Sequence, residues 1–266
     1  CRVLIFSIFA IVALPSFSTT SMFSVNLALA NTIVLPIAVS LIIAIMLFEL
    51  LRAVKMHKCI PVLITSEICG MSAPFIYEYN ANKYMFLITL LCAFVIFVTW
   101  LKKHKEIRYE QGFFVLAVMI LVPQSMSTMV RINNYNENGL FLLIMGLCGA
   151  WIADTGAYFS GVALGKHKLC PEISPKKTIE GFIGGILTTG IVYLIAFCVY
   201  DGFEFKTAIF AFLIGIVCAV IGTVGDLSAS MVKRQIGFKD YGKIMPGHGG
   251  LMDRFDSILF VLPTFY

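Results

Sequence analysis

The chain has 266 residues, of which 59% are hydrophobic and only 13% are charged, and its formal net charge is +5. An average soluble domain has about 25% charged residues, so this chain lacks the polar side chains that a water-exposed surface requires. The composition therefore excludes an ordinary soluble domain and predicts an integral membrane protein. The positive charge favours anionic lipids or ligands, although basic loop residues also orient membrane proteins.

Apolar runs that are candidates for membrane spans recur along the whole chain. A spanning helix needs about 20 mostly apolar residues. Eight such runs are followed by a ninth, from Ser257 to Tyr266, which is short for a span. We therefore predict an all-α polytopic membrane protein with eight or nine transmembrane helices, organised as a single membrane domain over residues 1–266. The eight runs lie at residues 3–17, 32–51, 59–77, 83–101, 111–129, 139–165, 178–200 and 206–232.

The loops between these runs are alternately rich and poor in basic residues. The poor set contains only Lys83, Arg131 and Lys206 of the 20 Lys and Arg residues. Basic loops stay on the cytoplasmic side of a membrane, so we expect the rich set to be cytoplasmic. The loop after residue 232 belongs to it and would meet nucleotides there. The rich set comprises Arg2, Arg52, Lys55, Lys58, Lys102, Lys103, Lys105, Arg108, Lys166, Lys168, Lys176, Lys177, Lys233, Arg234, Lys239, Lys243 and Arg254.

Small residues recur at helical spacing in the second half of the chain. They predict a close approach of neighbouring helices in lipid. The chain shows no internal repeat, which disfavours a transporter built from duplicated halves. The small residues are Ala157, Gly161, Gly165, Gly181 and Gly185.

Ionisable residues inside the apolar runs are costly and usually functional. Asp154 lies within the run at 139–165, directly after the apolar stretch from Leu140 to Ala153, and begins a polar island that ends at Tyr158. Asp154 would bind a metal, pair with a lysine of a neighbouring helix or accept a hydrogen bond from Tyr158. Glu49 lies three residues before Arg52, and we interpret the two as a structural ion pair.

A basic cluster precedes the run at 178–200. Ser174 stands before Pro175, a pattern typical of a helix N-cap and first helical position. Lys176 and Lys177 would then lie in the first helical turn, where cations are disfavoured. This arrangement is favourable if an anion binds there, since helix N-termini and lysines both attract phosphate. The alternative is that these are ordinary cytoplasmic lysines.

Asp226 lies within the run at 206–232, just after the apolar stretch from Ala211 to Val224, and begins the most polar part of the chain. If the helix continues, Ser230 and Lys233 share its face. The functional interpretation is a ligand or metal site, and the alternative is an Asp226–Lys233 pair that neutralises both charges.

Asp253 and Asp256 are three residues apart and would be neighbours on a helix. Close carboxylates repel unless a cation lies between them, and Mg²⁺ is bound by a few carboxylates plus substrate phosphates. The alternative is a solvated acidic helix start. Just upstream, Gly249 and Gly250 would let backbone N–H groups approach phosphate, and His248 would contact the ligand or be a buried structural histidine.

The residues from Ser230 to Asp256 resemble the signature of the phosphatidate cytidylyltransferase family, also called CDP-diacylglycerol synthases. The matching pattern is Ser-x-Val-Lys-Arg, then Lys-Asp-x-Gly, then Met-Pro-Gly-His-Gly-Gly-Leu-x-Asp-Arg-Phe-Asp. The islands at 154–158 and 174–181 are also similar to that family. Met245 is a conservative departure, where Leu or Ile is expected.

The resemblance implies a Mg²⁺-dependent reaction of CTP with phosphatidate that gives CDP-diacylglycerol and pyrophosphate in phospholipid biosynthesis. It also implies a polytopic fold, often a homodimer, with a polar cavity open to the cytoplasm and to lipid. Residues 1–138 would supply N-terminal spans, and residues 139–266 the catalytic spans and cytoplasmic loops. We expect an enzyme of the bacterial inner membrane whose active site faces the cytoplasm, with membrane lipid but no nucleic acid as a partner.

Roles follow from the resemblance together with the residue chemistry. Asp226 and Asp253 would hold Mg²⁺ with Asp256 in or next to the shell, and Asp240 would orient Lys239 or hold a second cation. Residues expected to be catalytic are Asp226, Lys233, Arg234, Lys239, Asp240, His248, Asp253 and Arg254. Residues expected to bind substrate are Asp154, Tyr158, Ser174, Lys176, Lys177, Thr178, Ser230, Gly249 and Gly250.

Two other functions remain open at this stage. A lipid kinase using CTP or ATP would share the membrane setting and the phosphate-binding clusters, but it would release a nucleoside diphosphate. A cation or proton transporter would explain Asp154 and Asp226 inside the membrane. It would not explain a glycine-rich histidine loop beside two acids.

Overall fold

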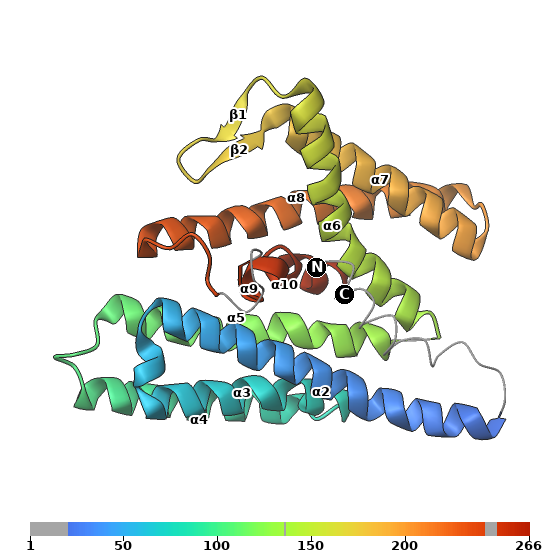
Figure 1. Ribbon diagram of the computed structural model, residues 1–266. Helices are drawn as coiled ribbons and strands as arrows, with labels where there is room; N and C mark the ends of the chain where they lie inside the picture. The colour runs from blue at the N-terminus through green and yellow to red at the C-terminus, as the bar shows by residue number, and fades with distance from the viewer. Residues whose placement is uncertain (1–20, 136, 243–248) are drawn as a thin grey trace. The chain divides into compact units, whose positions relative to one another are not determined.

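The computed structural model describes residues 21–135, 137–242 and 249–266, and this part of the chain is almost entirely helical (Figure 1). Seven helices are long and apolar enough to cross a membrane, which confirms the all-α polytopic class. They are α2 (Ser21–Ala53), α3 (Ile60–Glu78), α4 (Asn82–Lys102), α5 (Tyr109–Asn133), α6 (Gly139–Leu164), α7 (Ile179–Asp201) and α8 (Phe205–Ile236).

These helices match the second to the eighth predicted runs, while the first run, 3–17, lies outside the described residues. The ninth run forms α10 (Ile258–Phe265), whose eight residues rise only about 12 Å and are too short to span. The remaining elements are the short helices η2 (Met56–Lys58) and α9 (Met252–Phe255) and the strands β1 (Lys168–Cys170) and β2 (Ser174–Thr178).

The described residues divide into two compact units. The first takes in the described residues within 1–140 and 240–254, and the second those within 141–239 and 255–266. The predicted division after residue 138 stays a prediction.

In the first unit, α2, α3 and α5 pack together and α4 lies against α3 and α5 (Figure 1). Gly70 allows a close approach of α3 to α2, because a Cβ there would lie 2.5 Å from Leu47 Cδ1. The α2–α3 and α4–α5 connections meet at one end of this unit, where Gln111 Nε2 donates to the Val54 carbonyl at 2.8 Å. Two of the lysine-rich loops therefore lie at the same end of the bundle.

In the second unit, α6 and α7 pack through small residues, as predicted. A Cβ on Gly181 would lie 2.7 Å from the Ala157 carbonyl oxygen and 3.2 Å from Gly161 Cα, and one on Gly185 would lie 2.7 Å from the Ala153 carbonyl oxygen. Helix α8 packs on α7 and also on α10.

The predicted helix start at Ser174 is wrong. Residues Ser174–Thr178 are extended and pair antiparallel with β1, with Lys168 opposite Thr178. The N-cap of α7 is Thr178, whose Oγ1 accepts the Gly181 N–H at 3.1 Å. Lys176 and Lys177 therefore precede the helix, which removes the unfavourable placement of cations in its first turn.

Candidate active site

In the second unit, an ion pair joins two of the predicted motifs. Lys177 Nζ of β2 lies 2.6 Å from Asp226 Oδ2 of α8, and each side chain is about a quarter exposed (24% and 25%). A second contact nearby has Arg234 Nε donating to the Ile173 carbonyl at 3.4 Å. The hairpin is thus held against the C-terminal half of α8 by two residues that the sequence singled out, Lys177 for substrate binding and Arg234 for catalysis.

Glu180 fixes the other side of the hairpin. Its carboxylate accepts the backbone N–H groups of Lys166 and His167 at 3.1–3.3 Å and lies 2.6 Å from His167 Nδ1. Because Glu180 in the first turn of α7 binds the α6–β1 connection, the hairpin that contains Lys176 and Lys177 is anchored to α7.

Asp256 is buried beside the same end of α8, with 7% of its surface exposed. Its Oδ1 accepts the Ser257 N–H at 2.8 Å. Burial, together with the negative charges of Asp226 and Asp154, raises the pKa of Asp256 to about 8, against the opposing attraction of Lys233. Asp256 is therefore influenced by the charges of Asp226, Asp154 and Lys233, all predicted site residues.

Close packing explains why Asp256 lies there. Gly225 of α8 has no side chain, and a Cβ at this position would lie 3.0 Å from the Asp256 carbonyl oxygen and 3.2 Å from Ser257 Cα. Among the described residues, no group of three or more His, Cys, Asp or Glu side chains is arranged to hold a metal ion. Mg²⁺ usually takes only one or two carboxylates and completes its shell with water and substrate phosphates.

In the first unit, Asp253 organises the end of the glycine-rich segment. Its Oδ2 accepts the N–H groups of Tyr241 and Gly250, both at 2.9 Å. Gly249 has φ +82°, and a Cβ there would lie 3.1 Å from that same oxygen and 3.4 Å from Asp240 Oδ1. The Gly250 N–H thus serves Asp253 in this structure, and a phosphate contact at this glycine stays a prediction.

Glu49 is the residue that sequence reasoning misinterpreted. Its carboxylate accepts the N–H groups of Leu251 (3.0 Å, Oε1) and Met252 (2.8 Å, Oε2), and only 2% of its surface is exposed. Arg52 attracts this charge, but the hydrogen-bond partners are backbone groups of residues 249–253, the motif segment. An acidic residue inside an apolar span was the available signal, because such a group requires partners.

The other predicted residues are distributed as follows. Tyr158 is exposed and lies edge-on to the Phe159 ring, with centroids 5.5 Å apart. Lys176, Lys239 and Asp240 are exposed, whereas Ser174, Ser230 and Arg254 are half-buried. His248 lies outside the described residues. The predicted metal set draws Asp253 from the first unit and Asp226 and Asp256 from the second, and it stays a prediction.

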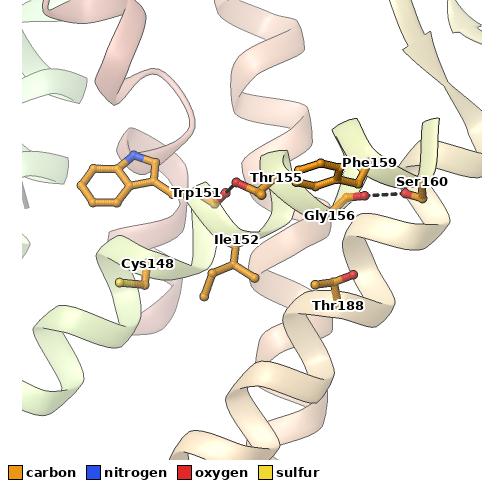
Figure 2. Close-up of a pocket in the computed structure, with 8 residues that line it drawn as sticks. All are labelled: Cys148, Trp151, Ile152, Thr155, Gly156, Phe159, Ser160 and Thr188. Carbon is orange, nitrogen blue, oxygen red and sulfur yellow. Dashed lines mark hydrogen bonds between the residues drawn. The ribbon is translucent and has the colours of Figure 1, made fainter. Parts of the chain in front are cut away.

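One cavity of about 410 Å³ lies along α6 in the second unit (Figure 2). Its lining is mostly apolar, and the hydroxyls of Thr155, Ser160 and Thr188 donate to carbonyls of their own helices. With no charged side chain in its lining, it does not correspond to the predicted polar cavity, which stays a prediction. The lining residues are Cys148, Trp151, Ile152, Thr155, Gly156, Phe159, Ser160 and Thr188.

A polytopic helical bundle with grouped carboxylates and basic side chains defines a membrane protein equipped to handle phosphate anions. Residues 7–266 match the cytidylyltransferase family, and the chain belongs to that family. The resemblance seen in the sequence is thereby confirmed.

Relatives extend this finding. A phosphatidate cytidylyltransferase of Bacillus subtilis is 37% identical over 225 residues, which is 83% of this chain and 82% of the relative. Proteins of the same name from Staphylococcus saprophyticus and Staphylococcus aureus are 48% and 47% identical over 128 and 129 residues. Those two alignments span about half of this chain and about half the length of each relative (48% in every case). None of these relatives favours a lipid kinase or a transporter.

Proposed function

We propose that the chain is a phosphatidate cytidylyltransferase, which converts CTP and phosphatidate to CDP-diacylglycerol and pyrophosphate. Family membership and the relative matched over 83% of the chain support this function. The structural observation that carries it is the Lys177–Asp226 pair, with Asp256 packed against the adjacent Gly225 of α8. Such a cluster offers cations for phosphate and carboxylates for a metal.

In the proposed reaction, a phosphate oxygen of phosphatidate attacks the α-phosphorus of CTP in line. A new P–O bond forms, the bond from the α-phosphorus to the bridging oxygen breaks, and pyrophosphate leaves with that electron pair. The phosphate is already an anion, so the protein chiefly has to position two anions and offset their charge. Lys176 and Lys177 of the anchored hairpin, with Lys233 and Arg234 of α8, would do this.

Mg²⁺ fits the carboxylates that the second unit brings together. Asp226 already attracts an ammonium group at 2.6 Å, and Asp256 lies close enough for the charge of Asp226 to act on it. These two residues of the second unit would hold the ion. When bound, Mg²⁺ would offset triphosphate charge.

The proposed location is the bacterial inner membrane, with the site on the cytoplasmic side. The basic loops support this orientation by the positive-inside rule. In the first unit, the motif segment meets Glu49 near the C-terminal end of α2. The basic residues Arg52, Lys55 and Lys58 follow Glu49 closely in the sequence. The homodimer implied by the resemblance stays a prediction, which the mass of the purified protein in detergent tests.

The decisive experiment measures pyrophosphate release by purified protein in detergent with CTP, phosphatidate and Mg²⁺. We expect release that requires all three, and a loss of about 100-fold in Lys177→Gln, the size expected when one charged donor to the reacting phosphates is removed. Lys168→Gln, an exposed lysine of the same hairpin, is the control and should retain activity. Formation of CDP or ADP would instead indicate a kinase, and no turnover of folded protein would refute the proposal.

A further inference from the structure

The carboxylate of Glu49 binds a segment that lies 202 positions further along the chain. A buried ionisable group in a membrane helix is costly unless it is satisfied. Both of its oxygens are used, one for the Leu251 N–H and the other for the Met252 N–H. These contacts therefore join α2 to the start of α9.

The segment is shaped to receive this carboxylate. A Cβ on Gly242 would collide with Glu49 Oε1, and a Cβ on Gly250 would lie 2.5 Å from both Glu49 oxygens. A Cβ on Gly242 would also lie 3.0 Å from Gly250 Cα. Two stretches of backbone thus meet around the carboxylate at positions where only glycine fits.

The same segment carries Asp253, the predicted metal ligand. Three successive N–H groups, those of Gly250, Leu251 and Met252, are divided between two carboxylates, the first going to Asp253 and the next two to Glu49. Tyr241 adds a further donor to Asp253. Any shift of the backbone at 251–252 would therefore be transmitted to the hydrogen bonds that orient the Asp253 side chain.

We infer that Glu49 is a positioning residue for the reaction, which holds the backbone at 249–253 so that Asp253 is correctly oriented. This inference rests on the proposed function for its kinetic part. Glu49 acts through the backbone and through Asp253.

The test compares Glu49→Gln with Glu67→Gln. Glu67 is the matched control because it lies in α3 of the same unit, and its Oε2 has no hydrogen-bond partner among the described residues. Glutamine keeps the shape of Glu49 but places an NH₂ group opposite one backbone donor. We expect kcat for pyrophosphate release to fall by about 100-fold with a change of less than about threefold in KM for CTP, since misplacing a group by about 1 Å costs that much.

Hydrogen exchange is the second readout and does not depend on activity. Peptides covering 249–253 should exchange faster in Glu49→Gln, while peptides of α3 and α5 should not change. If the wild-type protein proves to have no cytidylyl transfer activity, the proposed function fails, and exchange alone still decides whether Glu49 holds the segment. Glu49→Asp, which keeps the charge but shortens the side chain, should give an intermediate effect on both readouts.

Unchanged exchange at 249–253 would overturn the inference. So would faster exchange with normal kcat, because the segment would then be held without any consequence for the reaction. A fall in kcat matched by Glu67→Gln would also overturn it, since the effect would then be general to carboxylates in this bundle.

Discussion

Replacing Gly225 with alanine should displace Asp256. The added Cβ would lie 2.9 Å from Phe260 Cδ2, 3.0 Å from the Asp256 carbonyl oxygen and 3.2 Å from Ser257 Cα. The phenyl ring can rotate away, but the other two atoms belong to the backbone. The chain at 256–257 must therefore retreat from α8 by a few tenths of an ångström.

Gly222→Ala supplies the control for this prediction. It lies nearly one turn away on the same helix, and its Cβ would meet only Val261 Cγ2 closely, at 3.2 Å, with the next atoms at 3.8 and 3.9 Å. Both substitutions gain about the same helix propensity, so the difference between the variants isolates the backbone collision. Overpacking typically costs about 1–3 kcal/mol, which corresponds to about 2–12 °C in Tm for a chain of this size.

Thermal unfolding in detergent and pyrophosphate release should be measured on both variants. We expect Gly225→Ala to have the lower Tm by about that amount, and a turnover about tenfold below that of Gly222→Ala because a predicted metal ligand is out of place. Equal Tm and equal turnover in the two variants would refute the close-approach argument.

Three further predictions concern the hairpin and the motif segment. Thr178→Ala should lower the free energy of unfolding by about 1 kcal/mol through loss of the α7 N-cap, while Ser174→Ala should leave thermal unfolding nearly unchanged. If Ser174→Ala were instead the more destabilising substitution, the helix would begin at Ser174. Gly250→Ala should reduce both Tm and turnover, because its Cβ would lie 2.5 Å from both oxygens of Glu49; a fully active, stable variant would contradict this geometry. Asp253→Asn should lower turnover by orders of magnitude with little change in Tm, and removal of Mg²⁺ by EDTA should abolish pyrophosphate release; near-normal turnover of Asp253→Asn would show that this carboxylate does not hold the metal.

The spans were predictable because each depends only on a local run of apolar residues. The observed ends of α3 to α8 agree with the predicted ones within four residues, whereas α2 begins 11 residues before the predicted run. The alternation of basic loops was visible because it too depends only on local sequence. The α6–α7 packing was also predictable, since glycines at helical spacing act wherever two helices meet in lipid.

Features that depend on contacts distant in sequence were missed. The strand at Ser174–Thr178 exists because it pairs with Lys168–Cys170, and this pairing overrides the local Ser-Pro signal for a helix start. Lys177 and Asp226 were each chosen for their chemistry, but nothing in their local sequence predicted that they would pair. Glu49 was assigned to its near neighbour Arg52, because its actual partners lie near the other end of the chain.

The contact between Glu49 and the motif segment also sets an order of events during biosynthesis. Helix α2 leaves the ribosome 202 residues before the segment that satisfies its carboxylate. At about 5–20 residues per second this interval lasts about 10–40 s. During that time the bilayer receives an acidic helix whose partners have not yet been synthesised. The first unit therefore closes around this side chain only after α3 to α8 have been made, so a segment translated much later locks the first helices in place.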